Sequence, residues 1–372
     1  MSRQPLKLGV LGAGMIATYP YGVLPNLKYI PEKVEVVAIA DPLFERAQEV
    51  QQQFQIPHAY RTLEEMLEHS DLDAVANLTP IPVHGTTSMA ILKSGKHLVT
   101  EKPLASTIEE ADALIATAAE KGLTIICAPP DMLAPHYQTV RGMIQDGVIG
   151  RVAFARVRGS HGGPAAYSWP NDPTWFYQKG SGPLLDMGVY GIHQITGLLG
   201  PAQRVAAFSG ITEPTRLARG GPFHGKEIEV TADDNTLFML DFGQSTFAVV
   251  DGSYNVNAAR SPNMEIFGRA GTININDGWM ENGGGPLVEV YKVDAVAGLS
   301  GWIVPEGRDL EVAEERYGRL RRANLIDHLV DCIWERRRPV LSAEHARHAL
   351  EIMLKVTESA RTGRAIDLST SF

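Results

Sequence analysis

The chain has 372 residues, 44% of them hydrophobic and 21% charged, which excludes intrinsic disorder and allows two globular domains. Its formal net charge of −9 argues against binding to nucleic acid, because such proteins concentrate basic side chains on one face. No apolar run reaches the roughly 20 residues of a membrane span, and the two distant cysteines, Cys127 and Cys332, predict neither a disulfide nor a metal site, so we expect a cytoplasmic protein.

Strands and helices alternate over about the first 125 residues. Helical periodicity, as in 42–54 and 108–122, separates short runs of β-branched residues, which lie at 7–12, 34–41, 74–79, 97–101 and 123–127. This alternation is typical of a parallel sheet covered by helices. We therefore predict an α/β fold that begins with a Rossmann domain over residues 1–127.

The pattern changes from Arg151 onward. Turns such as FGQS and GRAG join strand-like runs at 151–158, 203–210, 236–242, 245–254, 264–269, 271–275 and 287–293. Two helical patterns, 322–337 and 342–363, close the chain. Residues 128–372 are therefore predicted to form an α+β domain with an open, mostly antiparallel sheet, whose closing helix can pack back on the first domain.

A glycine-rich turn follows the first predicted strand directly. Gly12, Gly14 and Ala17 occupy the three positions of a dinucleotide fingerprint, with Met15 and Ile16 between them. Gly12 permits the tight turn, Gly14 lets the backbone approach a pyrophosphate, and Ala17 lets the helix pack on the strand. The turn therefore predicts a nicotinamide dinucleotide site.

The second predicted strand ends in an acid, Asp41, where a carboxylate can accept hydrogen bonds from ribose hydroxyls. The insertion at 19–33 explains why Asp41 lies farther from Gly12 than the usual spacing of about 20 residues. A carboxylate repels a ribose 2′-phosphate, and no Arg or Lys follows directly, since Arg46 is five residues on. NAD is therefore favoured over NADP.

The stretch GSGPLLDMGVYGIHQ, residues 180–194, places polar side chains in an apolar helical pattern that glycines open. At about 100° per residue, Asp186, Tyr190 and His193 share one face of an α-helix. Such a stripe either faces water or lines a site.

Two further segments continue the strand ends of the first domain, NLTPIPVH at 77–84 and HLVTEKPLA at 97–105. With the glycine-rich turn and the GSGPLLDMGVY segment, they resemble the glucose-fructose oxidoreductase/inositol dehydrogenase (Gfo/Idh/MocA) family over nearly the whole chain. The resemblance implies a Rossmann domain followed by an open antiparallel sheet. It also implies an NAD(P)-dependent oxidoreductase that transfers hydride between the cofactor and a secondary alcohol of a sugar, polyol or related compound.

Carried over position by position, the resemblance makes Lys102 the cation beside the reacting hydroxyl and Asp186 the carboxylate of the second domain. Inositol dehydrogenase-like members have a histidine four residues after that aspartate, whereas this chain has Tyr190 there and His193 three residues later. A tyrosine is similar to the glucose-fructose oxidoreductase and dihydrodiol dehydrogenase branches. The proton carrier is then Tyr190, assisted by Lys102, or else His193.

The remaining expected site residues accompany these. Beside the cofactor we expect Thr79, Pro80, His84, Glu101 and Lys102. His193, Trp175 and Tyr177 are expected to bind the substrate, although the two aromatic residues equally suit a packing cluster. No metal is expected.

Two other functions stay open on the same scaffold. One is a non-catalytic, NAD-binding regulator that senses a metabolite, and the other is a glycoside-cleaving enzyme that uses tightly bound NAD for transient oxidation. A binding module has no need for the ammonium, carboxylate and phenol of Lys102, Asp186 and Tyr190, so catalysis is favoured. An open sheet leaves an apolar face uncovered, which predicts a homodimer or homotetramer.

Overall fold

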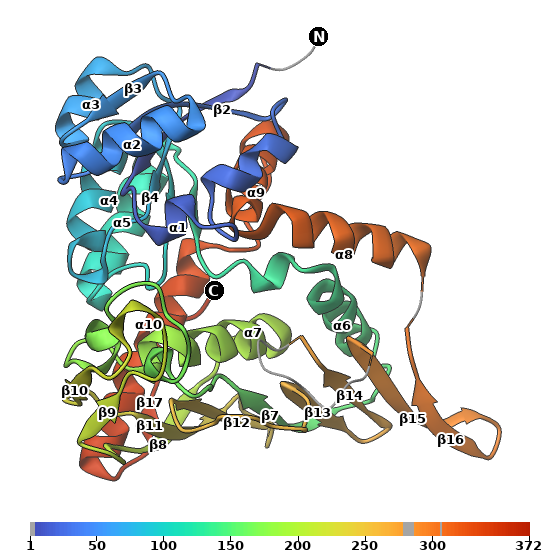
Figure 1. Ribbon diagram of the computed structural model, residues 1–372. Coiled ribbons are helices and arrows are strands. Elements are labelled where there is room, and N and C mark those ends of the chain that lie inside the picture. The colour runs from blue at the N-terminus through green and yellow to red at the C-terminus, as the bar shows by residue number, and fades with distance from the viewer. Residues whose placement is uncertain (1–3, 278–285, 306) are drawn as a thin grey trace. The chain divides into compact units, whose positions relative to one another are not determined.

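The computed structural model describes residues 4–277, 286–305 and 307–372, and its chain divides into two compact units (Figure 1). The N-terminal unit runs to Pro135 and includes Asp309–Leu350, and the C-terminal unit comprises His136–Arg308 and Glu351–Phe372. The first unit extends beyond the expected boundary at residue 127 and takes in Asp309–Leu350, which we call the returning segment. This segment includes the start of the closing helix, Ala343–Thr362, which was expected to pack back on the first domain.

The N-terminal unit is built on a parallel sheet of six strands in the order β3-β2-β1-β4-β5-β6, the doubly wound Rossmann order. This confirms the predicted fold of the domain, except that the short β3 was not predicted. Its strands are β1 Leu6–Leu11, β2 Val34–Ala40, β3 His58–Tyr60, β4 Ala74–Asn77, β5 His97–Thr100 and β6 Ile125–Cys127.

Capping threonines precede two helices of this unit, α3 (Leu63–His69) and α5 (Ile108–Lys121). Thr62 and Thr107 cap α3 and α5 by accepting the backbone N–H of Glu65 and Glu110, each at 3.2 Å. The insertion before β2 forms a short 3₁₀ helix at Leu24–Tyr29. The helices are α1 Met15–Thr18, α2 Phe44–Phe54, α3 Leu63–His69, α4 His84–Lys93 and α5 Ile108–Lys121.

The returning segment contains α8 (Arg308–Leu320), which the sequence analysis missed, and α9 (Asn324–Glu335). α9 packs against β5 and β6 and is buried along most of its length. The Lys33 ammonium bonds Asp327 at 2.7 Å and Asp331 at 2.5 Å, which fixes α9 beside the start of β2. This burial is why the segment belongs to the N-terminal unit.

The C-terminal unit contains a sheet in the order β16-β15-β14-β13-β7-β12-β11-β8-β17. Its described pairings are antiparallel apart from β7 with β12, so the predicted open, mostly antiparallel sheet is confirmed. The strands are β7 Val152–Arg158, β8 Arg204–Gly210, β11 Asn235–Asp241, β12 Phe247–Ser253, β13 Met264–Gly268, β14 Gly271–Ile275, β15 Val288–Val296, β16 Leu299–Ile303 and β17 Ile366–Asp367.

The two faces of this sheet differ. Helices α6 (Pro135–Gln145) and α7 (Val189–Leu199) lie on one face (Figure 1), and α7 covers Val157 and Val250. The opposite face exposes apolar side chains in register, with Phe208 across from Leu237 and Met239 across from Val249. We call the exposed set the open face; it comprises Phe154, Phe208, Leu237, Met239, Phe247 and Val249.

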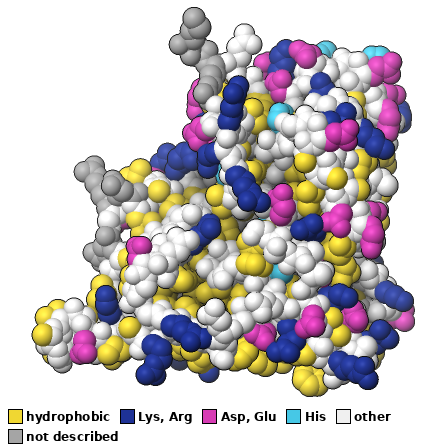
Figure 2. All heavy atoms as spheres, turned by 180° about the vertical axis from the view of Figure 1, so that it is seen from behind, with side chains coloured by type: hydrophobic (Ala, Val, Ile, Leu, Met, Phe, Trp, Pro, Cys, Tyr) yellow, Lys and Arg dark blue, Asp and Glu magenta, His cyan; other side chains and the backbone are white. Residues whose placement is uncertain are grey.

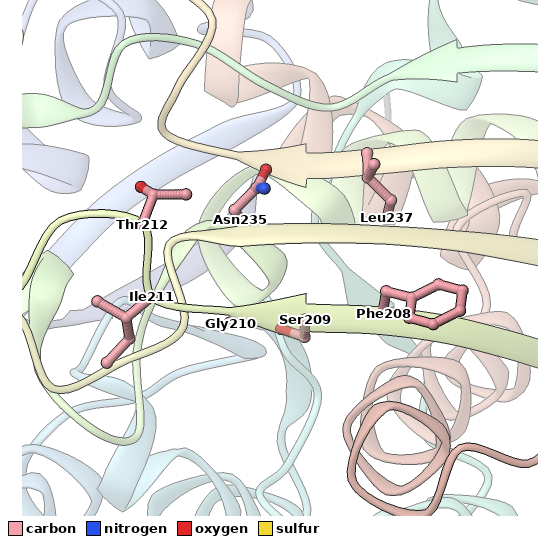
Figure 3. A pocket seen from close by; sticks show the side chains of 7 residues that line it. All are labelled: Phe208, Ser209, Gly210, Ile211, Thr212, Asn235 and Leu237. Carbon is pink, nitrogen blue, oxygen red and sulfur yellow. The ribbon is translucent and has the colours of Figure 1, made fainter.

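A shallow hollow of about 270 Å³ lies beside the end of β8 on the open face (Figure 3). Phe208, Ile211 and Leu237 give it an apolar lining, and Ser209, Thr212 and Asn235 add polar groups. Elsewhere, Lys and Arg side chains are interspersed with Asp and Glu on the face that Figure 2 shows. No helix in the described ranges is both long and apolar enough to cross a bilayer.

The pH dependence of stability should report the buried His328 of α9. Its Nε2 accepts the backbone N–H of Val340 at 3.0 Å, and burial, followed by the charge of Arg337, lowers the pKa of His328 to about 4. The unfolded chain binds this proton below about pH 6.5 and the native chain does not, so stability falls as pH drops from 6.5 towards 4. Urea unfolding should show a loss of about 3 kcal/mol over that range.

The control for this prediction is His328→Gln, which keeps an acceptor for Val340 but cannot titrate. Its free energy of unfolding should vary less with pH than that of the wild type. Equal slopes for the two proteins between pH 6.5 and 4 would contradict the assignment.

Candidate active site

The glycine-rich turn has the geometry that a dinucleotide requires. Gly12 adopts φ +100°, and a Cβ there would meet the Leu78 carbonyl oxygen at 2.9 Å, so only glycine fits. Apart from its chain neighbours and its own helix backbone, Gly14 has no described atom within 4 Å of the position that a Cβ would take, which leaves room for a pyrophosphate. Ala17 is fully buried, and Met15 and Ile16 complete the turn. The residues present therefore fit the cofactor.

Asp41 lies at the end of β2 and is joined to this turn. Its carboxylate accepts the backbone N–H of Ala13 and of Leu43, each at 2.9 Å, and bonds the Arg46 guanidinium at 2.9 Å. The five residues between Asp41 and Arg46 do not separate the two side chains, because α2 begins at Phe44 and its first turn brings Arg46 back over Asp41.

His84 joins the loops that follow β4 and β5. Its Nδ1 lies 3.0 Å from the Pro103 carbonyl oxygen, and its Nε2 lies 2.5 Å from that of Thr79. The ring is 1% exposed. The His84 ring thus connects the loop that contains Thr79 and Pro80 to the loop that carries Lys102.

A buried ion pair holds the EKP loop. Glu101 and Arg322 are joined at 2.5 Å, and their side chains are 9% and 12% exposed. The same carboxylate accepts the backbone N–H of Lys102 at 3.3 Å, and the backbone N–H of Arg322 donates to Tyr21. Arg322 thereby connects the returning segment to the half-buried Lys102. Arg322 was not among the expected residues, because nothing in its local pattern distinguishes it from neighbouring arginines.

Asp186 lies in a π-helical turn, Leu184–Gly188, which leads into α7. The expected regular α-helix through Asp186, Tyr190 and His193 is therefore interrupted, because a π turn has more residues per turn than an α-helix. That the three side chains share one face stays a prediction. Asp186 and Tyr190 are half-buried, whereas His193 is 5% exposed.

Tyr254 fixes the carboxylate of Asp186. The Tyr254 hydroxyl donates to Asp186 at 2.9 Å, the ring is buried, and His161 stacks on it with 5.4 Å between ring centroids. Burial raises the pKa of Tyr254 well above its usual value, so the phenol stays protonated and donates. The sequence analysis missed both residues, although each follows one strand of the parallel pair β7 and β12, whose carboxyl ends meet at one edge.

Glycine allows α7 to lie close to the sheet. A Cβ on Gly191 would meet Val157 at 3.0 Å and Val250 at 3.2 Å. A larger residue would push the helix outward and displace Tyr190, its neighbour in the chain. The glycines of this stretch therefore set the depth at which its polar residues lie.

The two expected aromatic substrate residues differ. Tyr177 is 1% exposed, its hydroxyl accepts the backbone N–H of Ala165 at 3.0 Å, and burial raises its pKa to about 12. A ring enclosed in this way cannot stack on a ligand, so the substrate-binding expectation for Tyr177 is corrected to a packing role. Trp175 is 43% exposed and remains a predicted substrate residue.

Lys102 belongs to the N-terminal unit, and Asp186, Tyr190 and His193 belong to the C-terminal unit. Their joint action on one substrate therefore stays a prediction. Cys127 and Cys332 are buried free thiols. No three His, Cys, Asp or Glu side chains of the described residues are placed to hold a metal ion.

Comparison with known proteins agrees with this geometry. Residues 6–147 match the family described as "Oxidoreductase family, NAD-binding Rossmann fold", and residues 137–274 match the "GFO/IDH/MocA C-terminal domain". The chain belongs to the Gfo/Idh/MocA oxidoreductase family. The resemblance stated from the sequence is confirmed, as are the NAD cofactor and the assignment to an oxidoreductase.

Curated relatives of this Gfo/Idh/MocA protein include dehydrogenases. Levoglucosan dehydrogenase of Pseudarthrobacter phenanthrenivorans is 26% identical, over 73% of this chain and 74% of that protein. Trans-1,2-dihydrobenzene-1,2-diol dehydrogenase of Xenopus tropicalis is 28% identical, over 73% and 76%. A solved Bordetella pertussis dehydrogenase in complex with NADH and UDP-GlcNAcA has a TM-score of 0.80 at 18% identity, over 100% of both chains, and supports the fold.

Removing Arg322 should destabilise the protein, because Glu101 is then left buried without its counter-ion. We expect Arg322→Gln to lower the free energy of unfolding by about 3 kcal/mol. The matched control is Arg319→Gln, whose pair with Glu315 is exposed and should cost under about 1 kcal/mol. Similar losses in the two variants under urea would show that the buried pair has no special weight.

Proposed function

We propose that the protein catalyses hydride transfer between NAD(H) and a secondary alcohol of a sugar, polyol or related compound. The observation that carries this proposal is the Asp186 carboxylate, held by the buried Tyr254 hydroxyl at the edge where β7 and β12 end. A fixed acceptor of this kind suits a ligand with several hydroxyl groups. The named substrates of the relatives are of this class and support it.

When bound, the nicotinamide ring supplies the hydride acceptor or donor. The chain must then take up the hydroxyl proton of the alcohol, and we assign this to Tyr190 Oη. Lys102 favours the ionised phenol and the developing alkoxide through its positive charge. Asp186 orients the substrate hydroxyls, and His193 and Trp175 contribute to substrate binding.

Screening a panel of sugars, polyols and cyclic diols at the NADH absorbance tests the reaction. Turnover of at least one member is expected. If NAD binds but nothing in a broad panel is turned over, the proposed reaction is wrong, and a metabolite-sensing regulator takes its place. Cofactor that survives purification without net NADH production would instead favour transient oxidation during glycoside cleavage.

Tyr190→Phe tests the proton carrier, because it keeps the ring and deletes the transferable proton. The value of kcat should fall by about 10² to 10⁴ with NAD affinity nearly unchanged. Lys102→Met should lower kcat similarly, and the double variant should lose far less than the product of the two losses. Steady-state kinetics on the best panel substrate measures this.

His193→Ala is the comparison for that experiment, and it should mainly raise KM. If Tyr190→Phe keeps near-normal turnover while His193→Ala abolishes it, the proton carrier is the histidine. In that case the likeness to the tyrosine branch of the family is misleading.

We also propose that the protein forms a homodimer or homotetramer through the open face. We propose a reducing, cytoplasmic compartment for it. Phe208 is 84% exposed and pairs with Leu237 of the neighbouring strand β11, which also carries Met239. Apolar surface of this extent on a sheet commonly meets a copy of itself. The two free, buried thiols suit that compartment.

Light scattering at micromolar concentration should give a multiple of 40.5 kDa. Phe208→Asp should shift the mass to that of one chain, because the interface would then bury a charge without a partner. Val312→Asp, an equally polar change at an exposed position of α8, should leave the mass unaltered. A monomeric wild type would refute the assembly.

A further inference from the structure

The end of β2 carries an ion pair whose two members differ in exposure. The Asp41 side chain is 4% exposed, and the Arg46 side chain is 44% exposed. Three donors of this chain already bond the carboxylate, namely the backbone N–H of Ala13, that of Leu43, and the Arg46 guanidinium. A carboxylate has about four acceptor positions, so little of it is left for ribose hydroxyls.

The guanidinium changes the electrostatics of the ribose position. An isolated Asp41 carboxylate would repel a 2′-phosphate, but a cation at 2.9 Å offsets that charge. A guanidinium has five N–H donors in a planar fork that matches phosphate oxygens. The bond from Arg46 to Asp41 uses one terminal nitrogen of the guanidinium, Nη2. The rest of the fork extends from a side chain that is 44% exposed.

We infer that Arg46, acting with Asp41, determines the cofactor selectivity of this chain. Arg46 compensates the carboxylate and gives a 2′-phosphate a partner, so NADP(H) binds only moderately more weakly than NAD(H). The inference rests on dinucleotide binding at the Gly12–Ala17 turn, which belongs to the proposed function. It does not depend on the roles of Lys102 and Tyr190.

Isothermal titration with NAD⁺ and with NADP⁺, without any substrate, tests the inference. Arg46→Ala should weaken NADP⁺ binding by about tenfold or more, the loss of one charge-assisted contact, and should change NAD⁺ binding little. The ratio of the two dissociation constants should therefore rise. Equal weakening of both cofactors would overturn the inference, since Arg46 would then only hold Asp41 in place.

A second pair of variants makes the test independent of that comparison. Asp41→Ser removes the negative charge and should tighten NADP⁺ binding, which narrows or reverses the preference for NAD⁺. If Arg46 binds the phosphate, the double variant Asp41→Ser/Arg46→Ala should lose this gain. A gain that persists without Arg46 would contradict the proposed role.

Arg61→Gln is the matched control, because it removes the same charge at the same edge of the sheet. The Arg61 guanidinium lies 4.9 Å from the centre of the Phe44 ring and is stacked over it. The Arg61→Gln variant should leave the ratio of the NADP⁺ and NAD⁺ dissociation constants unaltered. A change in this ratio equal to that caused by Arg46→Ala would overturn a specific role for Arg46. If the ratios behave as expected while the substrate panel shows no turnover, only the proposed reaction fails. If neither dinucleotide binds, both proposals fail.

Discussion

In the N-terminal unit, β1 pairs in parallel with β2 on one side and with β4 on the other, so the chain leaves all three strands at the same edge of the sheet. The glycine-rich turn, Asp41 and the Thr79 loop meet there for that reason alone. β5 extends the series and adds the Lys102 loop. The C-terminal unit has the same arrangement at one pair of strands, because β7 and β12 are parallel and His161 and Tyr254 follow their carboxyl ends. Each half of the candidate site is thus a consequence of strand direction.

Most of the fold could be predicted because its signals are local. Strand runs, helical periodicity and the glycine fingerprint each occupy one stretch of sequence, and their order indicates the parallel sheet. The short strand β3 and the helix α8 were missed for different reasons. β3 has three residues and no buried side chain, so it carries no apolar pattern. α8 is mostly polar, but Leu310, Ala313, Tyr317 and Leu320 recur at helical spacing, so its sequence does contain a signal that was overlooked.

Residues of the candidate site were predictable only where a single segment of sequence determines their role. Gly12 and Gly14 carry their function in the turn itself, but Arg322 acts on Glu101 across 221 positions of sequence, and no local pattern reports such a contact. The error on Arg46 has another cause. Arg46 is five residues from Asp41 in sequence but close to it in space, because the first turn of α2 returns the chain towards the residue before the helix. The π turn at Asp186 shows the same limit, since an angular argument requires the helix type to be known.

Two carboxylates at one sheet edge, Asp41 and Glu101, are each held by an arginine, yet exposure gives the two pairs different roles. Arg322 is buried with Glu101, so no ligand can reach this ion pair, and the pair stabilises the loop that carries Lys102. Arg46 bonds Asp41 with the same chemistry but extends into solvent, where a ligand can reach it. An arginine of the first kind should affect stability, and one of the second kind should affect the choice of ligand. The distinction follows from burial and not from residue type, which is why composition and spacing could not provide it.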